Sequence, residues 1–233
     1  MPAAYADADL LAEASQRLIR TVDQLDDAAW AEPSGLPGWT RAHVVAHLVL
    51  NAEGLSGALG GLVQGEAIPM YASQEGRDRD IEDLAQAEPT ELRTRLLGAT
   101  TDLADALAAI PEDVWSTRIE RVPGGRTFAA ASVPDMRLRE VEIHHVDLGV
   151  GYGRADWSTG FAASVIDSMG HRDTGDSAFT VRATDLDRSW SLGSGTGPTV
   201  SGTSVDLAWW LTGRGTGDGL TSDDGELPGI GAW

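Results

Sequence analysis

The chain contains no cysteine and no lysine among its 233 residues, and all 17 basic residues are arginine. Without cysteine it cannot form a disulfide, a thiolate metal site or a cysteine nucleophile. Without lysine it cannot form a Schiff base with a carbonyl substrate. Any thiol chemistry at this protein therefore needs a thiol from outside the chain.

Positive charge is also scarce, because 36 acidic side chains stand against 17 basic ones and give a formal net charge of −19. Nucleic acids and anionic membrane surfaces repel such a protein, so we expect neither as its main partner. An anionic small molecule can bind only where arginines gather locally.

No stretch approaches the roughly twenty apolar residues that a membrane-spanning helix requires. The N-terminus is acidic and lacks the basic region and the apolar run of a signal peptide. We therefore expect a cytoplasmic protein, and we take it to be a monomer.

The hydrophobic pattern divides the chain near residue 153. Apolar residues recur at helical spacing over 6–29, from about 40 to 54 or beyond, over 90–110 and from about 132–135 to 149–151. Beyond the division, a helix at about 157–171 precedes short alternating segments and a final helix at about 204–212. This pattern predicts an α+β protein with a helical bundle at 1–153 and a small α/β domain at 154–233.

Residues 137–148 crowd histidines and carboxylates into one predicted helix. Glu140 and His144 lie four residues apart and therefore share a face, with Asp147 one turn further on. An acid and an imidazole on an otherwise apolar helix provide two ligands of a metal site, and the third must come from elsewhere in the chain. The best candidate is His47, which also lies among aliphatic residues.

Each of these residues also has an ordinary explanation. A single histidine such as His47 is more often a hydrogen-bonded core residue than a metal ligand. Glu140 can form a salt bridge with Arg137 or Arg139. The three residues together favour a metal site, because helical bundles commonly build such sites from Glu and His projecting inward on facing helices.

The donor set indicates which metal to expect. Two imidazoles and one carboxylate suit zinc with an open fourth position for water or substrate. His43 and His145 are alternative ligands, and Asp147 is a candidate to orient an imidazole by a hydrogen bond. The spacing alone does not identify a reaction.

Four separated groups of motifs resemble those of one enzyme family, in the same order along the chain. They are Gly38-Trp39-Thr40-Arg41 with Ala46-His47; Pro69-Met70-Tyr71 with Arg77-Asp78 and Ile81; Arg139-Glu140-Val141 with Ile143-His144 and 146–149; and Gly213-Arg214-Gly215 with 219–222 and 226–228. Over nearly its whole length the chain resembles the mycothiol-dependent maleylpyruvate isomerases, members of the DinB-like superfamily of metal-binding four-helix bundles.

The resemblance implies an N-terminal DinB-like four-helix bundle that binds zinc through His47, Glu140 and His144, followed by a small C-terminal α/β domain. It also implies that Arg77 and Arg214 bind a small dicarboxylate substrate, since guanidinium groups grip carboxylates in a bidentate fork. Considered without the resemblance, both arginines would be ordinary surface charges.

The activity that the resemblance implies is conversion of maleylpyruvate to fumarylpyruvate in gentisate-type aromatic degradation, with mycothiol as the thiol. Addition of a thiol turns the cis double bond into a single bond, and rotation followed by elimination gives the trans isomer. The absence of cysteine agrees with an external thiol. Two alternatives remain: a mycothiol-dependent S-transferase acting on electrophiles, and a non-catalytic metal-binding stress protein.

Overall fold

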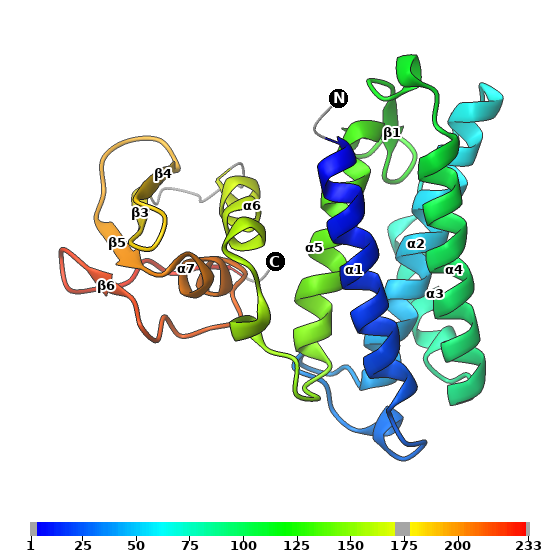
Figure 1. Cartoon of the computed structure of the whole chain (residues 1–233), viewed down its shortest axis with the longest axis horizontal. Coiled ribbons are helices and arrows are strands. Elements are labelled where there is room, and N and C mark those ends of the chain that lie inside the picture. Colours follow the sequence, from blue (N-terminus) through cyan, green and yellow to red (C-terminus); the bar gives the residue numbers. More distant parts are fainter. Residues whose placement is uncertain (1–3, 171–177, 232–233) are drawn as a thin grey trace. The chain divides into compact units, whose positions relative to one another are not determined.

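In the computed structural model, which describes residues 4–170 and 178–231, the chain divides between Tyr152 and Gly153 into two units (Figure 1). The first unit is helical apart from one hairpin, and the second combines helices with a sheet. The α+β fold class predicted from the sequence is therefore confirmed. None of the helices in the described part of the chain is both long and apolar enough to cross a membrane.

Four long helices form the bundle of the first unit: α1 (Ala4–Asp23), α2 (Arg41–Gln64), α4 (Pro89–Ala109) and α5 (Val133–Asp147). Helix α2 packs mainly against α4, and α1 packs mainly against α5, while the shorter α3 (Gln74–Leu84) lies on α2. Aliphatic side chains at helical spacing fill the space between them, as the sequence pattern predicts. Fully covered examples are Val44, Leu48, Leu92, Leu96 and Val141.

The ends of two bundle helices have identifiable local causes. Thr40 is the N-cap of α2, as predicted, and its backbone N–H donates to Nδ1 of His43 at 3.2 Å. Helix α1 ends at Asp23, so the predicted continuation to residue 29 is wrong. The side chain of Asp26 accepts a hydrogen bond from the backbone N–H of Ala29 at 2.9 Å, and a 3-10 turn follows at Ala29–Ala31. This local hydrogen bond takes the place of a further turn of α1.

A two-stranded hairpin, β1 (Arg118–Glu120) and β2 (Thr127–Ala129), holds the loop that leads into α3. The backbone N–H of Tyr71 donates to the carbonyl of Arg121 at 2.9 Å, and that of Met70 donates to Glu120. Ser73 then caps α3 by accepting from the backbone N–H of Gly76 at 2.9 Å. Arg77 consequently lies in the first turns of α3.

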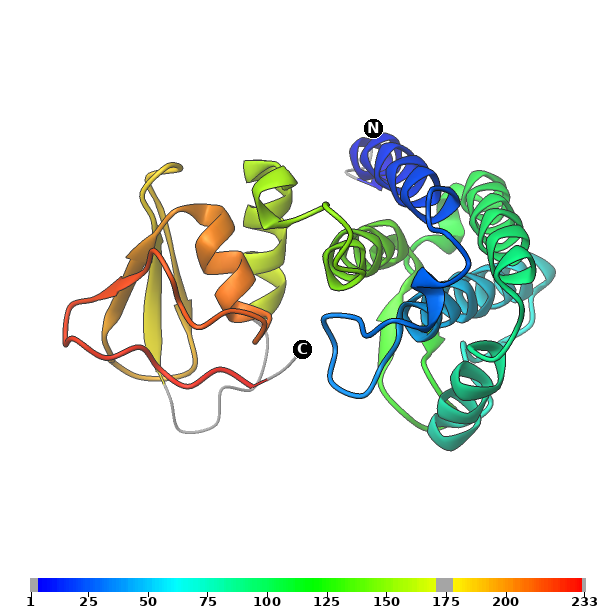
Figure 2. The same ribbon diagram turned by 90° about the horizontal axis from the view of Figure 1, so that it is seen from below.

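The second unit is a four-stranded sheet covered by two helices. The strand order is β4 (Arg188–Leu192), β3 (Phe179–Ala183), β5 (Thr199–Gly202) and β6 (Thr221–Ser222), with β3 and β5 parallel and the other pairs antiparallel. Figure 2 shows α6 (Thr159–Met169) and α7 (Ser204–Leu211) side by side on one face of this sheet. Residue 171, the last of the helix predicted at 157–171, lies outside the described residues.

Candidate metal centre

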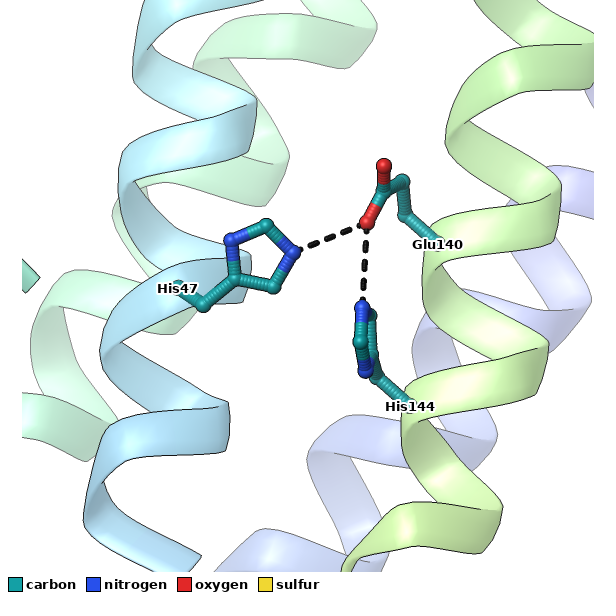
Figure 3. Close-up of side chains that lie close together, drawn as sticks. All are labelled: His47, Glu140 and His144. Carbon is teal, nitrogen blue, oxygen red and sulfur yellow. Dashed lines mark hydrogen bonds and ion pairs between the residues drawn. The ribbon is translucent and has the colours of Figure 1, made fainter. Parts of the chain in front are cut away.

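Three side chains that could ligate a metal converge between α2 and α5 (Figure 3). His47 projects from α2, while Glu140 and His144 project from successive turns of α5. Nε2 of His47 lies 2.9 Å from Oε2 of Glu140, and Nε2 of His144 lies 3.3 Å from the same oxygen. The structure thus brings together the three residues that the spacing argument selected.

The apolar neighbours of these residues explain why polar side chains face the interior of the bundle. Val44 and Leu48 lie beside His47 on α2, Val141 follows Glu140 on α5, and all three aliphatic side chains are fully covered. The two imidazoles are almost fully buried, at 6% and 8% exposed, whereas the side chain of Glu140 is 22% exposed. Glu140 is therefore the most exposed of the three side chains.

The geometry fits a zinc ion. Ligand atoms about 2.0–2.2 Å from a tetrahedral metal lie about 3.3–3.6 Å apart. The distances to Oε2 of Glu140 are 2.9 and 3.3 Å, and the three ligand atoms lie within 4.8 Å of one another. Two imidazole nitrogens and one carboxylate oxygen are a donor set that zinc accepts with its fourth position left open. The residues present are thus suitable for a catalytic type of site.

Asp147 fixes the orientation of His144. Its buried carboxylate lies 2.8 Å from Nδ1 of His144, which leaves Nε2 directed at Glu140. Burial acts to lower the pKa of His144, but hydrogen bonds to Asp147 and Glu140 outweigh burial, and the pKa is raised. A carboxylate bonded to the far nitrogen of a ligating histidine is the usual way in which proteins orient such a ligand.

The carboxyl group of Glu140 is held as a carboxylate by the two imidazoles. Burial acts to raise its pKa, but hydrogen bonds from His144 and His47 outweigh that effect and lower it well below the ordinary value. In the part of the chain that the structure describes, neither Arg137 nor Arg139 forms an ion pair with Glu140. The salt bridge of Glu140 that the sequence offered as an alternative to metal binding is therefore not formed with either arginine.

The two arginines have other partners. The side chain of Arg137, only 1% exposed, crosses to α2, where Nη1 donates to the carbonyl of Leu48 at 2.8 Å and to Oδ1 of Asn51 at 2.7 Å. Burial lowers the pKa of Arg137 to about 10. Arg139 pairs with Asp135, one turn earlier on α5.

His47 has a different environment from His144. Its Nδ1 lies 3.1 Å from Nη2 of Arg77, and its ring centroid lies 5.8 Å from that of Trp39. Burial is the main cause that lowers the pKa of His47 to about 4, and the positive charges of His144 and Arg77 act in the same direction. The guanidinium of Arg77 also lies over the ring of Tyr71, at 5.7 Å. Sequence reasoning missed the roles of Trp39 and Tyr71 as walls of the cluster.

The alternative histidines have partners elsewhere. His43 bonds to Thr40 through Nδ1, and its Nε2 lies 3.2 Å from Glu82. Nε2 of His145 lies 2.8 Å from the hydroxyl of Thr21. Neither histidine joins the group of three ligands within the described residues.

Of the two arginines proposed to bind substrate, Arg77 lies beside the cluster through its contact with His47. Arg214 belongs to the second unit, directly after α7, where it is half-buried and Nη1 donates to the carbonyl of Thr212 at 3.3 Å. The participation of Arg214 in this site stays a prediction.

Comparison with known proteins assigns both units to one family. The family model described as the mycothiol maleylpyruvate isomerase N-terminal domain matches residues 11–149, and the model described as the MDMPI C-terminal domain matches residues 154–231. Crystal structures of the mycothiol-dependent maleylpyruvate isomerase and of a histidine-to-alanine mutant each have a TM-score of 0.90 and 28% identity, covering 100% of this chain and 98% of theirs.

The match to the curated relatives covers only part of each chain. An uncharacterized protein of Mycobacterium tuberculosis, from strains CDC 1551 and H37Rv, is 30% identical over 152 residues. The match covers 63% of this chain, and the chain spans only 56% of the length of those relatives.

Proposed function

The chain belongs to the mycothiol maleylpyruvate isomerase family, and from this premise we propose that it is a zinc-dependent cis–trans isomerase. Its substrate would be maleylpyruvate, its product fumarylpyruvate and its thiol mycothiol, in gentisate-type aromatic degradation. The observation that carries the proposal is the convergence of His47, Glu140 and His144 within 4.8 Å of one another. Membership of the DinB-like superfamily, a cytoplasmic location and a monomeric state are expectations that accompany it.

His47, Glu140 and His144 would hold the zinc ion, and neighbouring residues position their side chains. Zinc, when bound, lowers the pKa of a thiol and polarises a carbonyl group. Asp147 keeps the ring of His144 in the ligating orientation, and the carboxylate oxygen Oε2 of Glu140 lies 3.3 Å from Nε2 of that ring. Trp39 lies beside His47, with the two ring centroids 5.8 Å apart.

The substrate class follows from charge. The protein carries a net charge of −19, so a dianion can bind only at a local concentration of arginine. Arg77 lies 3.1 Å from His47, so one guanidinium is already next to the proposed zinc position. We propose that Arg77 and Arg214, the two arginines that the family resemblance selects, bind the carboxylates of the substrate.

The first experiment measures conversion of maleylpyruvate by the zinc-loaded full chain, with and without mycothiol. The proposal requires conversion only when both zinc and mycothiol are present. Isomerase activity that persists without mycothiol, or in a His47→Ala protein that has lost zinc, would refute it. Bound zinc without any turnover of maleylpyruvate would instead favour the non-catalytic metal-binding alternative.

The second experiment tests the arginines against matched controls. Arg77→Gln and Arg214→Gln should each lower kcat/KM by about 10–100-fold, because a hydrogen bond to a charged group contributes about 1.5–3 kcal/mol. Arg79→Gln and Arg182→Gln remove the same charge from exposed positions of the same units and should change kcat/KM less than about threefold. Equal effects at all four positions would exclude specific binding of the substrate carboxylates.

A further inference from the structure

The hydrogen bond between Arg77 and His47 determines which ring nitrogen of His47 carries the proton. Nη2 of Arg77 lies 3.1 Å from Nδ1 of His47. A guanidinium group only donates hydrogen bonds, so Nδ1 must accept. A neutral imidazole has one N–H and one acceptor nitrogen. The proton therefore belongs to Nε2, which donates to Oε2 of Glu140 at 2.9 Å.

This arrangement conflicts with metal ligation through the same ring. Nε2 is the nitrogen of His47 that faces Glu140 and His144 (Figure 3). A nitrogen that ligates a metal needs its lone pair, so the proton of the ring must then lie on Nδ1. Two donors, N–H of His47 and N–H of Arg77, would face each other with no acceptor between them.

His144 provides the contrast within the same site. Its Nδ1 lies 2.8 Å from the carboxylate of Asp147, which accepts a hydrogen bond whether or not Nε2 ligates a metal. In His144, Nε2 faces the other ligands and Nδ1 has an acceptor for its proton, so both nitrogens suit metal ligation. In His47, Nε2 also faces the other ligands, but Nδ1 faces the guanidinium of Arg77, which accepts no hydrogen bond.

We propose that zinc binding at this site and the contact between Arg77 and His47 exclude each other, so that zinc loading releases Arg77 for the substrate. The inference rests on the proposed function, because it takes zinc at His47, Glu140 and His144 as given. Its consequence is an order of events: the carboxylate-binding guanidinium becomes available only after the metal has bound. The reciprocal consequence is that Arg77 weakens zinc binding in the absence of substrate.

Besides His47, the guanidinium of Arg77 contacts Asp78 and the ring of Tyr71. Its Nη1 bonds to Asp78 at 2.7 Å, and Asp78 is exposed, so this anchor can move with the guanidinium. Its Nε is buried without a hydrogen-bond partner among the described residues. The present position of the side chain is therefore incompletely satisfied, and a substrate carboxylate would offer the acceptor that Nε lacks.

A zinc titration of the full chain against a competing chelator tests the exclusion. Arg77→Met keeps a long side chain but removes the donor, and zinc should then bind at least about tenfold more tightly than to the wild type. Arg79→Met removes a charge from an exposed position of the same helix and should change zinc affinity less than threefold. Zinc affinity of Arg77→Met that equals or falls below that of Arg79→Met would overturn the inference.

A structural measurement separates the inference from the function on which it rests. Imidazole ¹⁵N spectra of the chelated protein should show His47 with its proton on Nε2, and a crystal structure of the zinc-loaded protein should show Nη2 of Arg77 more than about 3.5 Å from Nδ1. Zinc bound to His47 with that contact retained would refute the inference alone. Failure of zinc to bind both the wild type and Arg77→Met at the three ligands would refute the proposed function as well.

Discussion

The burial of His47 makes the stability of the bundle sensitive to acid over a defined range. Its side chain is 6% exposed, and burial is the main cause that lowers its pKa from 6.5 to about 4. The folded protein therefore keeps His47 neutral at pH values where the unfolded chain protonates it. The unfolded state binds more protons in this range, so stability is lost as the pH falls from about 6.5 toward about 4.

The magnitude follows from the two pKa values. The difference between 6.5 and about 4 corresponds to about 3 kcal/mol once the pH lies below both. Between pH 7 and pH 5 the expected loss from His47 is about 2 kcal/mol. The pKa of Glu140 is lowered, so its stabilisation is lost only when the pH falls below its ordinary value of 4.5. The raised pKa of His144 has the opposite effect, because it adds stability at low pH that is lost as the pH rises above 6.5. A matched variant is therefore needed to isolate the contribution of His47.

The assay is urea unfolding at pH 7 and pH 5, after chelation of any metal, because ligation would keep His47 neutral. Between the two pH values, His47→Gln should lose about 2 kcal/mol less stability than the wild type. Leu48→Val, at the adjacent buried position of α2, should cost about 1 kcal/mol at both pH values and keep the pH dependence of the wild type. The same pH dependence in His47→Gln and wild type would refute the reasoning.

Three further substitutions test the support of the site and of the helix that carries His47. Asp147→Asn replaces the carboxylate beside His144 with a weaker acceptor and should lower zinc affinity by about 10–100-fold in a chelator competition, whereas an unchanged affinity would deny Asp147 its orienting role. Gly54→Ala should destabilise by about 1 kcal/mol or more in urea unfolding, because the new Cβ would lie 2.7 Å from the carbonyl oxygen of Met70. Gly57→Ala, whose Cβ meets nothing within 4 Å, should stabilise by up to about 1 kcal/mol, and the same sign for both glycine variants would contradict the packing.

Part of the candidate site was predictable because helical spacing fixes it. Glu140 and His144 lie on one helix four residues apart, so any helix over these residues places them together. His43 and His47 share a face of α2 by the same rule, so the spacing left His43 as an alternative ligand beside His47. The choice depends on axial position, because His43 lies one turn nearer the start of the helix, where it bonds to Thr40.

The remaining parts of the site depend on contacts between distant segments, which no local pattern encodes. Trp39 reaches His47 because its loop is attached to α5, where the backbone N–H of Gly35 donates to the carbonyl of Asp147 at 2.6 Å. Tyr71 takes its place because its backbone pairs with the hairpin at Arg121. Both are long-range hydrogen bonds of irregular loops. The early end of α1 has a different cause, a local side-chain hydrogen bond between Asp26 and Ala29 that hydrophobic periodicity does not reveal.

The distribution of charge on α5 would allow so acidic a protein to offer the proposed site to an anion. Of the four carboxylates on this helix, only Glu140 lies between two imidazoles, and its charge would be offset by the metal that it binds. Zinc and Arg77 would together contribute three positive charges beside that single carboxylate, which makes the site locally cationic within a chain of net charge −19. The other three carboxylates are already paired with cationic or imidazole partners: Asp135 with Arg139, Glu142 with Arg17, and Asp147 with His144. Because fields beyond about 8 Å are largely screened at physiological salt, this local balance, and not the acidic surface, would decide whether the proposed dianionic substrate can bind.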